Sequence, residues 1–331
     1  MPNRHVDQRL CPGATLDDLD PAQIELYREE LDRRQPGSPL VRLPQEELLA
    51  QVGAVGGRTK FRPTLTGMLF FGRDPQRFYP SFTLTFLHFA GTEMAPSEPG
   101  APLYLDNREF RGTLPEMIGA ARATIYEKLG KKGVLNGFVR HDVADYPEFA
   151  YREAIVNATG HRDYGLEGSS VQIRLFADRL EVQSPGGLGG NLTLDNMVFE
   201  QYTRNPHIMR LLEDYGYVER RGLGVDQMIQ SMRNAGLEEP RFENRGSSFW
   251  VTLKSGPSLP SIPDLANLGL SERQIQAVTY LHAQGRITNR EYQDRFSVSE
   301  RTALYDLQGL VEAGVALPVS SGRGRFYILR V

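Results

Sequence analysis

The chain has 331 residues, 24% of them charged and 40% hydrophobic. These are ordinary values for a globular protein, and the length leaves room for roughly two or three domains with cores of their own. The net charge of −3 excludes a general affinity for nucleic acid, and the single cysteine, Cys11, excludes an internal disulfide.

The N-terminus reads as irregular chain followed by a charged helix. Asp20-Pro21 predicts the start of this helix, which extends to about Arg34, lies at the periphery and is broken by the Pro/Gly-rich segment 35–39. The first residues lack the apolar core of a signal peptide, and no run approaches the roughly 18 apolar residues of a membrane span. We therefore expect a cytoplasmic protein with no membrane partner.

Between residues 62 and 145 the pattern alternates between helix and strand. It predicts a short helix at 64–71, a strand at 82–89 and a helix at 114–129. Apolar side chains alternate along the strand, as β-structure with one buried face requires. Its phenylalanines therefore indicate core packing more strongly than a platform for stacking bases.

The most informative helix begins near Pro147 and carries three polar residues on one stripe. Glu153, Asn157 and His161 are spaced by four, which places them on the same helical face. A carboxylate one turn before a carboxamide suits a metal–nucleotide site, since Glu153 can accept a proton from water and the Asn157 oxygen can bind Mg²⁺. The alternative is an ordinary amphipathic helix with a solvated polar face.

Two glycine-rich segments follow this helix. Strands at 171–176 and 180–184 form a predicted hairpin, and the second strand runs into the segment 184–190, where glycines allow either close approach to an anion or a plain flexible loop. Further on, the segment 220–224 (Arg-Arg-Gly-Leu-Gly) precedes a helical pattern whose N-terminus could hold phosphate.

These motifs together resemble a known family. The stretches EAIVNATGHRDY, EVQSPGGL, YTRNPHIMRLLEDYGYVERRGLGVDQMI and SFWVTL are similar to the ATP-binding C-terminal module of RecG-like transcriptional regulators. That module is distantly similar to the ATPase fold of gyrase, MutL, the ninety-kilodalton heat-shock chaperone and sensor histidine kinases. The resemblance spans residues 146–254, and segment 62–80 resembles the part that precedes the module. The AlbA-type domain found at the start of many relatives is absent from this sequence.

The resemblance implies roles for individual residues. Glu153 would be the general base and Asn157 the Mg²⁺ ligand. The remaining nucleotide-binding positions would be Ser184, Gly186, Gly187, Gly222 and Gly224. Ser184 stands where the broader fold has an aspartate that accepts the adenine amino group, and an uncharged hydroxyl is the weaker acceptor. We therefore expect ATP to bind weakly or not at all, and an ATPase activity to be weak or absent.

Other enzyme classes are disfavoured by context. His161-Arg162-Asp163 matches the start of the protein-kinase catalytic loop, but Gly168 stands where that motif requires an asparagine. The chain also lacks the phosphate-binding motif GxxxxGK[ST]. Asn205-Pro206 is explained without a ligand, because asparagine is a good N-cap and proline suits the first helical position.

The C-terminus predicts a winged helix-turn-helix. Helices are expected at 271–285, 288–296 and 299–314, followed by strands 316–319 and 325–329 on either side of a turn with a basic tip. In the third helix, four residues are expected to face inward: Ala303, Leu304, Leu307 and Leu310.

The third helix would lie in the major groove of double-stranded DNA, with the wing on the phosphate backbone. The expected DNA-binding residues are Ser299, Arg301, Thr302, Tyr305, Arg323 and Arg325. Because single winged helices cover few base pairs, we expect a homodimer or larger homo-oligomer. The alternative is a helical module for protein interaction.

The sequence thus predicts an α+β protein: an ATPase-like α/β sandwich with a preceding mixed α/β segment and a C-terminal winged helix-turn-helix. The expected domains are 1–140, 141–254 and 269–331, with a linker at 255–268. The expected function is a DNA-binding transcriptional regulator with a weak ATP-binding module. The alternatives are an active Mg²⁺-dependent ATPase in DNA repair or remodelling, and a self-assembling scaffold that binds neither ligand.

Overall fold

The computed structural model describes residues 5–57, 60–96, 100–129, 131–136, 139–144, 146–218, 224–255, 265, 268–319 and 325–329. The chain divides into two compact units. The first comprises Met1–Ala235 and Glu239–Ser255, and the second comprises Gly236–Glu238 and Gly256–Val331. The first unit therefore includes both the N-terminal segment and the ATPase-like segment of the sequence.

A mixed sheet of six strands organises the first unit. Its order is β4-β3-β7-β8-β10-β9, with β3 and β7 parallel and all other neighbours antiparallel. The strands are β3 (Leu84–His88), β4 (Asp106–Phe110), β7 (Val171–Leu175), β8 (Arg179–Pro185), β9 (Arg241–Asn244) and β10 (Ser248–Lys254). Two small sheets pair β1 (Val55–Gly56) with β2 (Arg62–Pro63), and β5 (Lys131–Asn136) with β6 (Val139–Ala144). This mixed α and β architecture is consistent with an ATPase-like α/β fold.

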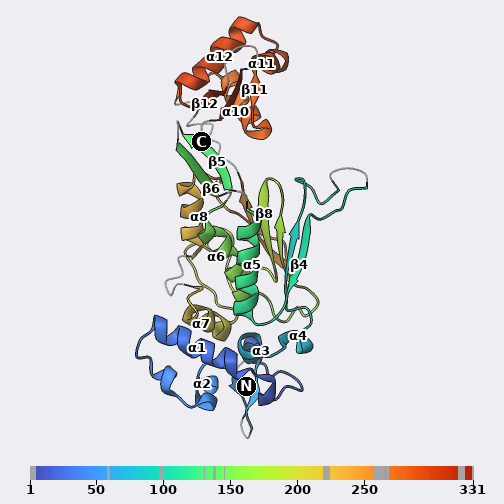
Figure 1. The fold of residues 1–331 in the computed structure, drawn as a ribbon, viewed down its shortest axis with the longest axis vertical. Helices are drawn as coiled ribbons and strands as arrows, with labels where there is room; N and C mark the ends of the chain where they lie inside the picture. The colour runs from blue at the N-terminus through green and yellow to red at the C-terminus, as the bar shows by residue number, and fades with distance from the viewer. Residues whose placement is uncertain are drawn as a thin grey trace. The chain divides into compact units, whose positions relative to one another are not determined.

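Helices α5 (Leu114–Lys128) and α6 (Glu148–Gly160) pack on the sheet, and α8 (Gly224–Asn234) lies beside α6 (Figure 1). The inner stripe of α6 is made of small residues, because Ala150, Ala154 and Ala158 are all buried. The helix contacts β7, β8 and β10, and small side chains allow closely packed elements.

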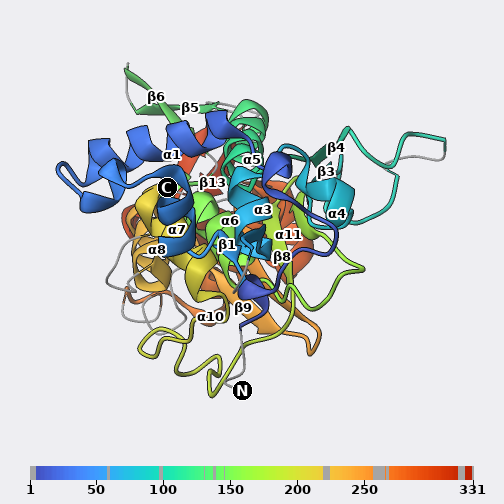
Figure 2. The same ribbon diagram turned by 90° about the horizontal axis from the view of Figure 1, so that it is seen from below.

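The N-terminal segment packs against helix α7 (Pro206–Asp214), which also contacts α6. The view from below shows N-terminal helices beside α7 (Figure 2). The elements of this segment are η1 (Val6–Gln8), η2 (Leu16–Asp18), α1 (Pro21–Arg34), η3 (Pro39–Arg42), α2 (Gln45–Gln51), α3 (Leu65–Phe71) and α4 (Pro75–Phe78). Most residues of α1 are exposed or half-buried, and its buried residues are Ile24, Tyr27 and Leu31. The Tyr27 hydroxyl donates a hydrogen bond of 2.8 Å to the Asp214 carboxylate.

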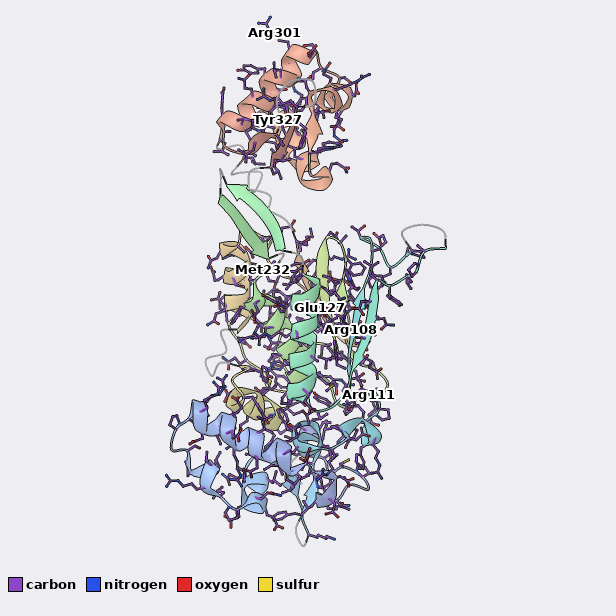
Figure 3. The ribbon with its side chains drawn as sticks, viewed as in Figure 1. Arg108, Arg111, Glu127, Met232, Arg301 and Tyr327 are labelled. Atoms are coloured by element: carbon purple, nitrogen blue, oxygen red, sulfur yellow. The ribbon has the colours of Figure 1, made fainter. Side chains whose placement is uncertain are left out.

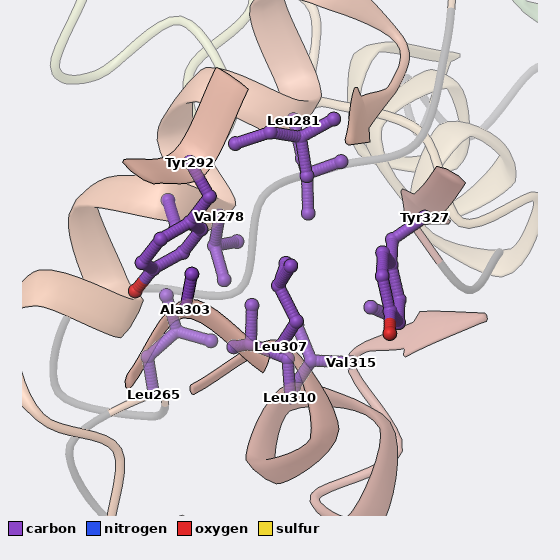
Figure 4. Close-up of a cluster of buried hydrophobic side chains, with 12 residues drawn as sticks. Leu265, Val278, Leu281, Tyr292, Ala303, Leu307, Leu310, Val315 and Tyr327 are labelled. Atoms are coloured by element: carbon purple, nitrogen blue, oxygen red, sulfur yellow. The ribbon is translucent and has the colours of Figure 1, made fainter. Parts of the chain in front are cut away.

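The described part of the second unit contains helices α10, α11 and α12 and a sheet of order β11-β13-β12. The elements are α10 (Glu272–Gln284), β11 (Ile287–Thr288), α11 (Asn289–Phe296), α12 (Glu300–Glu312), β12 (Ala316–Val319) and β13 (Phe326–Leu329). Its apolar core draws on all three helices and on β13 (Figure 4). Ala303, Leu307 and Leu310 are fully buried as expected.

One expected core residue of the second unit is misplaced. Leu304 is 44% exposed, because it follows the buried Ala303 by one helical step and so turns away from the core. The inward position next along the helix belongs to Asp306, which is 4% exposed. The identification as a winged helix-turn-helix and the domain boundaries stay predictions, and the expected linker lies almost wholly outside the described residues.

Candidate functional sites

The polar stripe of α6 faces a cavity of about 250 Å³ in the first unit. Glu153 is only 5% exposed, and its Oε1 accepts a hydrogen bond of 3.0 Å from Asn157 Nδ2. This bond fixes the amide so that its oxygen is the atom left to act as an acceptor. The arrangement keeps a buried carboxylate and a carboxamide oxygen side by side on the cavity wall.

Gly224 begins α8 directly against this carboxylate. A Cβ at position 224 would lie 1.8 Å from Glu153 Oε1, so only glycine allows this contact. The close approach places the N-terminal end of α8, which favours negative charge, beside the Glu153–Asn157 pair. Gly222 lies outside the described residues.

The glycine segment after β8 is closely packed by other parts of the protein. Gly186 has φ +97, and a Cβ there would lie 2.4 Å from Arg204 Nη1. A Cβ at Gly187 would lie 2.5 Å from Asn244 Oδ1. These glycines therefore allow close packing against other residues. The segment is not a plain flexible loop, which was one of the two possibilities that the sequence allowed.

Ser184 lies at the end of β8 and also lines the cavity. It is 5% exposed, and its hydroxyl donates a hydrogen bond of 2.7 Å to the backbone oxygen of Ala158. Because its only proton is used there, the hydroxyl can offer the cavity lone pairs alone. Ser184 is thus a neutral acceptor at this position.

Arg204 links the end of α6 to the glycine segment, a role that the sequence analysis missed. Its guanidinium donates to Gly187 O at 2.8 Å and to His161 O at 3.3 Å, and lies 3.9 Å from Asp163 Oδ2. Burial, assisted by the positive charge of Arg204, lowers the pKa of His161 to about 4. His161 is therefore neutral at physiological pH.

Arg162, the middle residue of the kinase-like tripeptide, has a structural role. It is 2% exposed, and its Nη2 donates to the backbone oxygens of Leu166 (2.8 Å) and Ser169 (2.6 Å). Its Cζ lies 4.2 Å from the Phe82 ring centroid. Arg162 thus anchors the loop that follows α6 and takes no part in the cavity lining.

The expected cap of α7 is wrong. Asn205 makes no side-chain hydrogen bond to the start of α7, and instead its Nδ2 donates to Gly160 O (2.9 Å) and Arg162 O (2.8 Å) at the end of α6. The α7 cap comes from the N-terminal segment, where Asp7 Oδ2 accepts from His207 N at 2.8 Å and Ile208 N at 3.4 Å. No local pattern could reveal a cap supplied from 200 residues away.

The structure brings the described nucleotide-site candidates together. The predicted residues on the cavity wall are Glu153, Asn157, Ser184, Gly186, Gly187 and Gly224. Further charged lining comes from Arg152, Arg204, Glu200 and Glu213. Among the described residues, no group of three or more His, Cys, Asp and Glu side chains is placed to hold a metal ion, so a cation here would depend on amide oxygen and ligand atoms.

A second candidate surface is the outer face of α12. Arg301 and Tyr305 are exposed, Tyr305 by 77%, and Figure 3 shows Arg301 extending from the outer end of the helix. Ser299 caps the helix by accepting from Thr302 N at 3.3 Å, and the two hydroxyls are 2.9 Å apart. Arg325 is exposed beside Tyr327, whereas Arg323 lies outside the described residues.

Asp306, on the inner side of α12, holds the three helices of the second unit together. Its carboxylate accepts from Arg273 Nε at 2.6 Å and from the Tyr292 hydroxyl at 3.1 Å. Its backbone oxygen accepts from Gln274 Nε2 at 3.0 Å. This buried network fixes α12 against α10 and α11, so its exposed face is rigidly presented.

Comparison with known proteins identifies part of the chain. Residues 168–253 match the family described as "Putative ATP-dependent DNA helicase recG C-terminal", and residues 2–85 match a domain of unknown function, DUF8451. A RecG-C-terminal-like, ATPase-type domain is therefore present. No curated protein matches the chain.

One solved structure shows a similar fold over almost the whole chain. The DIP2311 protein from Corynebacterium diphtheriae is 24% identical, with a TM-score of 0.59 over 98% of this chain. This chain spans 64% of the length of that protein. The likeness concerns the fold alone. Separately, every helix within the described residues is too short or too polar to cross a membrane.

Proposed function

We propose that the protein is a DNA-binding transcriptional regulator whose ATPase-type domain binds nucleotide weakly. The observation that carries the DNA-binding part is α12, whose inner face is locked by the core and by Asp306 while Arg301 and Tyr305 are exposed near its start. The N-terminal residues of a recognition helix are the ones that contact base edges in the major groove.

The connection between α11 and α12 supports this proposal. Ser297 ends α11 with φ +51, a left-handed conformation that turns the chain sharply, and Ser299 already caps α12. The strands β12 and β13 follow α12, and this order of elements supports the proposal of a winged helix. Because one such unit covers few base pairs, we further propose that the protein acts as a homodimer.

The cavity of the first unit has donor and acceptor groups that fit a Mg²⁺–nucleotide complex. The Asn157 amide oxygen would bind the metal, the N-terminus of α8 at Gly224 would face phosphate, and Ser184 would accept from the adenine amino group. Bound Mg²⁺ would neutralise phosphate charge beside Glu153. The neutral Ser184 replaces a charged acceptor, which lowers affinity by about 1.5–3 kcal/mol.

DNA binding is tested by selecting sequences from a random duplex pool with the full-length protein, then measuring gel shifts. Arg301→Ala should weaken binding by about 1–3 kcal/mol if Arg301 contacts a base, or reduce the salt slope by about one if it contacts phosphate. Arg233→Ala, at an exposed site on α8 in the first unit, is the matched control. Equal DNA binding by wild type and the Arg301 variant would contradict the assignment of α12 as the recognition helix.

Light scattering tests the proposed homodimer. We expect a dimer mass for the full-length protein at tens of micromolar, because paired half-sites require paired reading helices. A monomer at that concentration, with or without selected DNA, would contradict the dimer.

An active ATPase is the second candidate, favoured by one observation: buried Glu153 lies between Asn157 and the start of α8. A general base for water needs such a position next to the phosphate site. Phosphate release that is stimulated by DNA and lost in Glu153→Gln would establish this activity. The expected result is no steady turnover above that of the Glu153→Gln variant.

A further inference from the structure

We propose that Arg152 is the residue of the cavity that recognises the anionic, phosphate end of the ligand. Arg152 precedes Glu153 on α6, and both side chains line the cavity. This assignment rests on the proposed nucleotide site and adds the group that selects for phosphate. The sequence pattern does not single Arg152 out, because it lies beside the stripe of Glu153, Asn157 and His161 and not on it.

The Arg152 side chain has an unusual environment. Its Nε is buried and has no hydrogen-bond partner within the part of the chain that the structure describes. Its Cζ lies 5.2 Å from the centroid of the Phe149 ring, so one face of the guanidinium is covered by an aromatic side chain. No described carboxylate forms an ion pair with it. A guanidinium held in this way is partly desolvated and retains donors for an incoming acceptor.

The other arginine in the described cavity lining is already engaged. Arg204 donates to the backbone oxygens of Gly187 and His161, and it lies near Asp163. Withdrawing Arg204 toward a ligand would release the glycine segment that it holds. Among the described residues that line the cavity, Arg152 is therefore the cation that can bind a ligand without dismantling the cavity wall.

The charges of the described cavity residues limit where phosphate can bind. Glu153, Glu200 and Glu213 line the same cavity, so the protein already supplies negative charge there. Within the described lining, positive charge is offered to an anion at Arg152 and at the N-terminus of α8. A planar guanidinium binds two phosphate oxygens at once, which a point charge cannot do.

The test compares four ligands with the full-length protein by equilibrium dialysis in Mg²⁺: a non-hydrolysable ATP analogue, ADP, adenosine and pyrophosphate. Wild type should bind the ATP analogue more tightly than adenosine. Arg152→Ala should lower affinity for the analogue and pyrophosphate roughly ten- to a hundredfold, the loss of one charge-assisted bond, and leave adenosine binding unchanged. Arg152→Lys, which keeps the charge without the fork, should recover part of the affinity.

The control is Arg122→Ala, which removes an exposed arginine that pairs with Glu148 at the start of α6. It should bind all four ligands as wild type does. Equal affinity of wild type and Arg152→Ala for the analogue would overturn the assignment while leaving the nucleotide site standing. Arg152-dependent binding of pyrophosphate without any nucleoside ligand would support the assignment and refute the proposed nucleotide. Binding of none of the four would refute both.

Discussion

The cap that Asp7 provides for α7 makes the N-terminal segment part of the cavity's support. Asp7 is fully buried and accepts from two backbone N–H groups of α7, a helix whose Met209 and Glu213 line the cavity. Asp7→Ala removes the oxygen that accepts both hydrogen bonds. Loss of a helix cap costs about 0.5–2 kcal/mol, and buried N–H groups without partners add about 1–3 kcal/mol each. We expect a total loss of about 2–4 kcal/mol, since water will reach part of the exposed helix end.

An opposing effect comes from the other carboxylate oxygen. Asp7 Oδ1 is buried and has no hydrogen-bond partner among the described residues. Removing the charge therefore also removes part of the free-energy cost of burying it. Asp7→Asn keeps an acceptor oxygen without the charge. It should therefore be much closer to wild type than Asp7→Ala, within about 1 kcal/mol, the usual size of a charge effect at a helix end.

Urea unfolding followed by tryptophan fluorescence measures this effect in the right unit, because Trp250, the single tryptophan, lies on β10 of the first unit. The control is Asp20→Ala, which removes the more exposed cap of α1, where Asp20 Oδ1 accepts from Ala22 N at 3.2 Å. That variant should lose only about 0.5–1 kcal/mol. If Asp7→Ala is no more destabilising than Asp20→Ala, the cap does not hold α7 and the reasoning is refuted.

Two further predictions concern the cavity. The pKa of His161 lies near 4, below its ordinary 6.5, so the unfolded chain takes up a proton between these values while the folded protein does not. Stability should therefore fall as pH is lowered from about 6.5 toward 4, by up to about 1.4 kcal/mol per pH unit, and urea unfolding of His161→Gln should show a flatter dependence. Gly224→Ala should displace Glu153, because the added Cβ would lie 1.8 Å from its carboxylate oxygen, and should abolish nucleotide binding in equilibrium dialysis. Gly119→Ala, in α5 where nothing lies within 4 Å, is its control and should raise stability by about 0.5–1 kcal/mol. Unchanged binding by Gly224→Ala would contradict the site geometry.

The sequence predicted most of the longer helices because their signals are local, and it predicted the strands β3, β7, β8, β12 and β13. Asp20 and Pro21 mark the start of α1, Thr64 caps α3, and Ser271, Thr288 and Ser299 cap the helices of the second unit. Each of these groups bonds within its own turn, so neighbouring residues suffice to define it. The spacing of Glu153 and Asn157 likewise placed both on the cavity wall, since a helix fixes which residues share a face.

Tertiary structure decided which long-range partner each polar side chain found. Asn205 was expected to cap its own helix, but it bonds the end of α6, and Asp7 caps α7 in its place. In α12, Leu304 was expected in the core but is exposed, and Asp306 is buried instead. The core can hold this carboxylate because a side chain of another helix, Arg273, donates a hydrogen bond to it. Local patterns are fixed by bonds within one helical turn, whereas these partners depend on how segments far apart in the chain pack together.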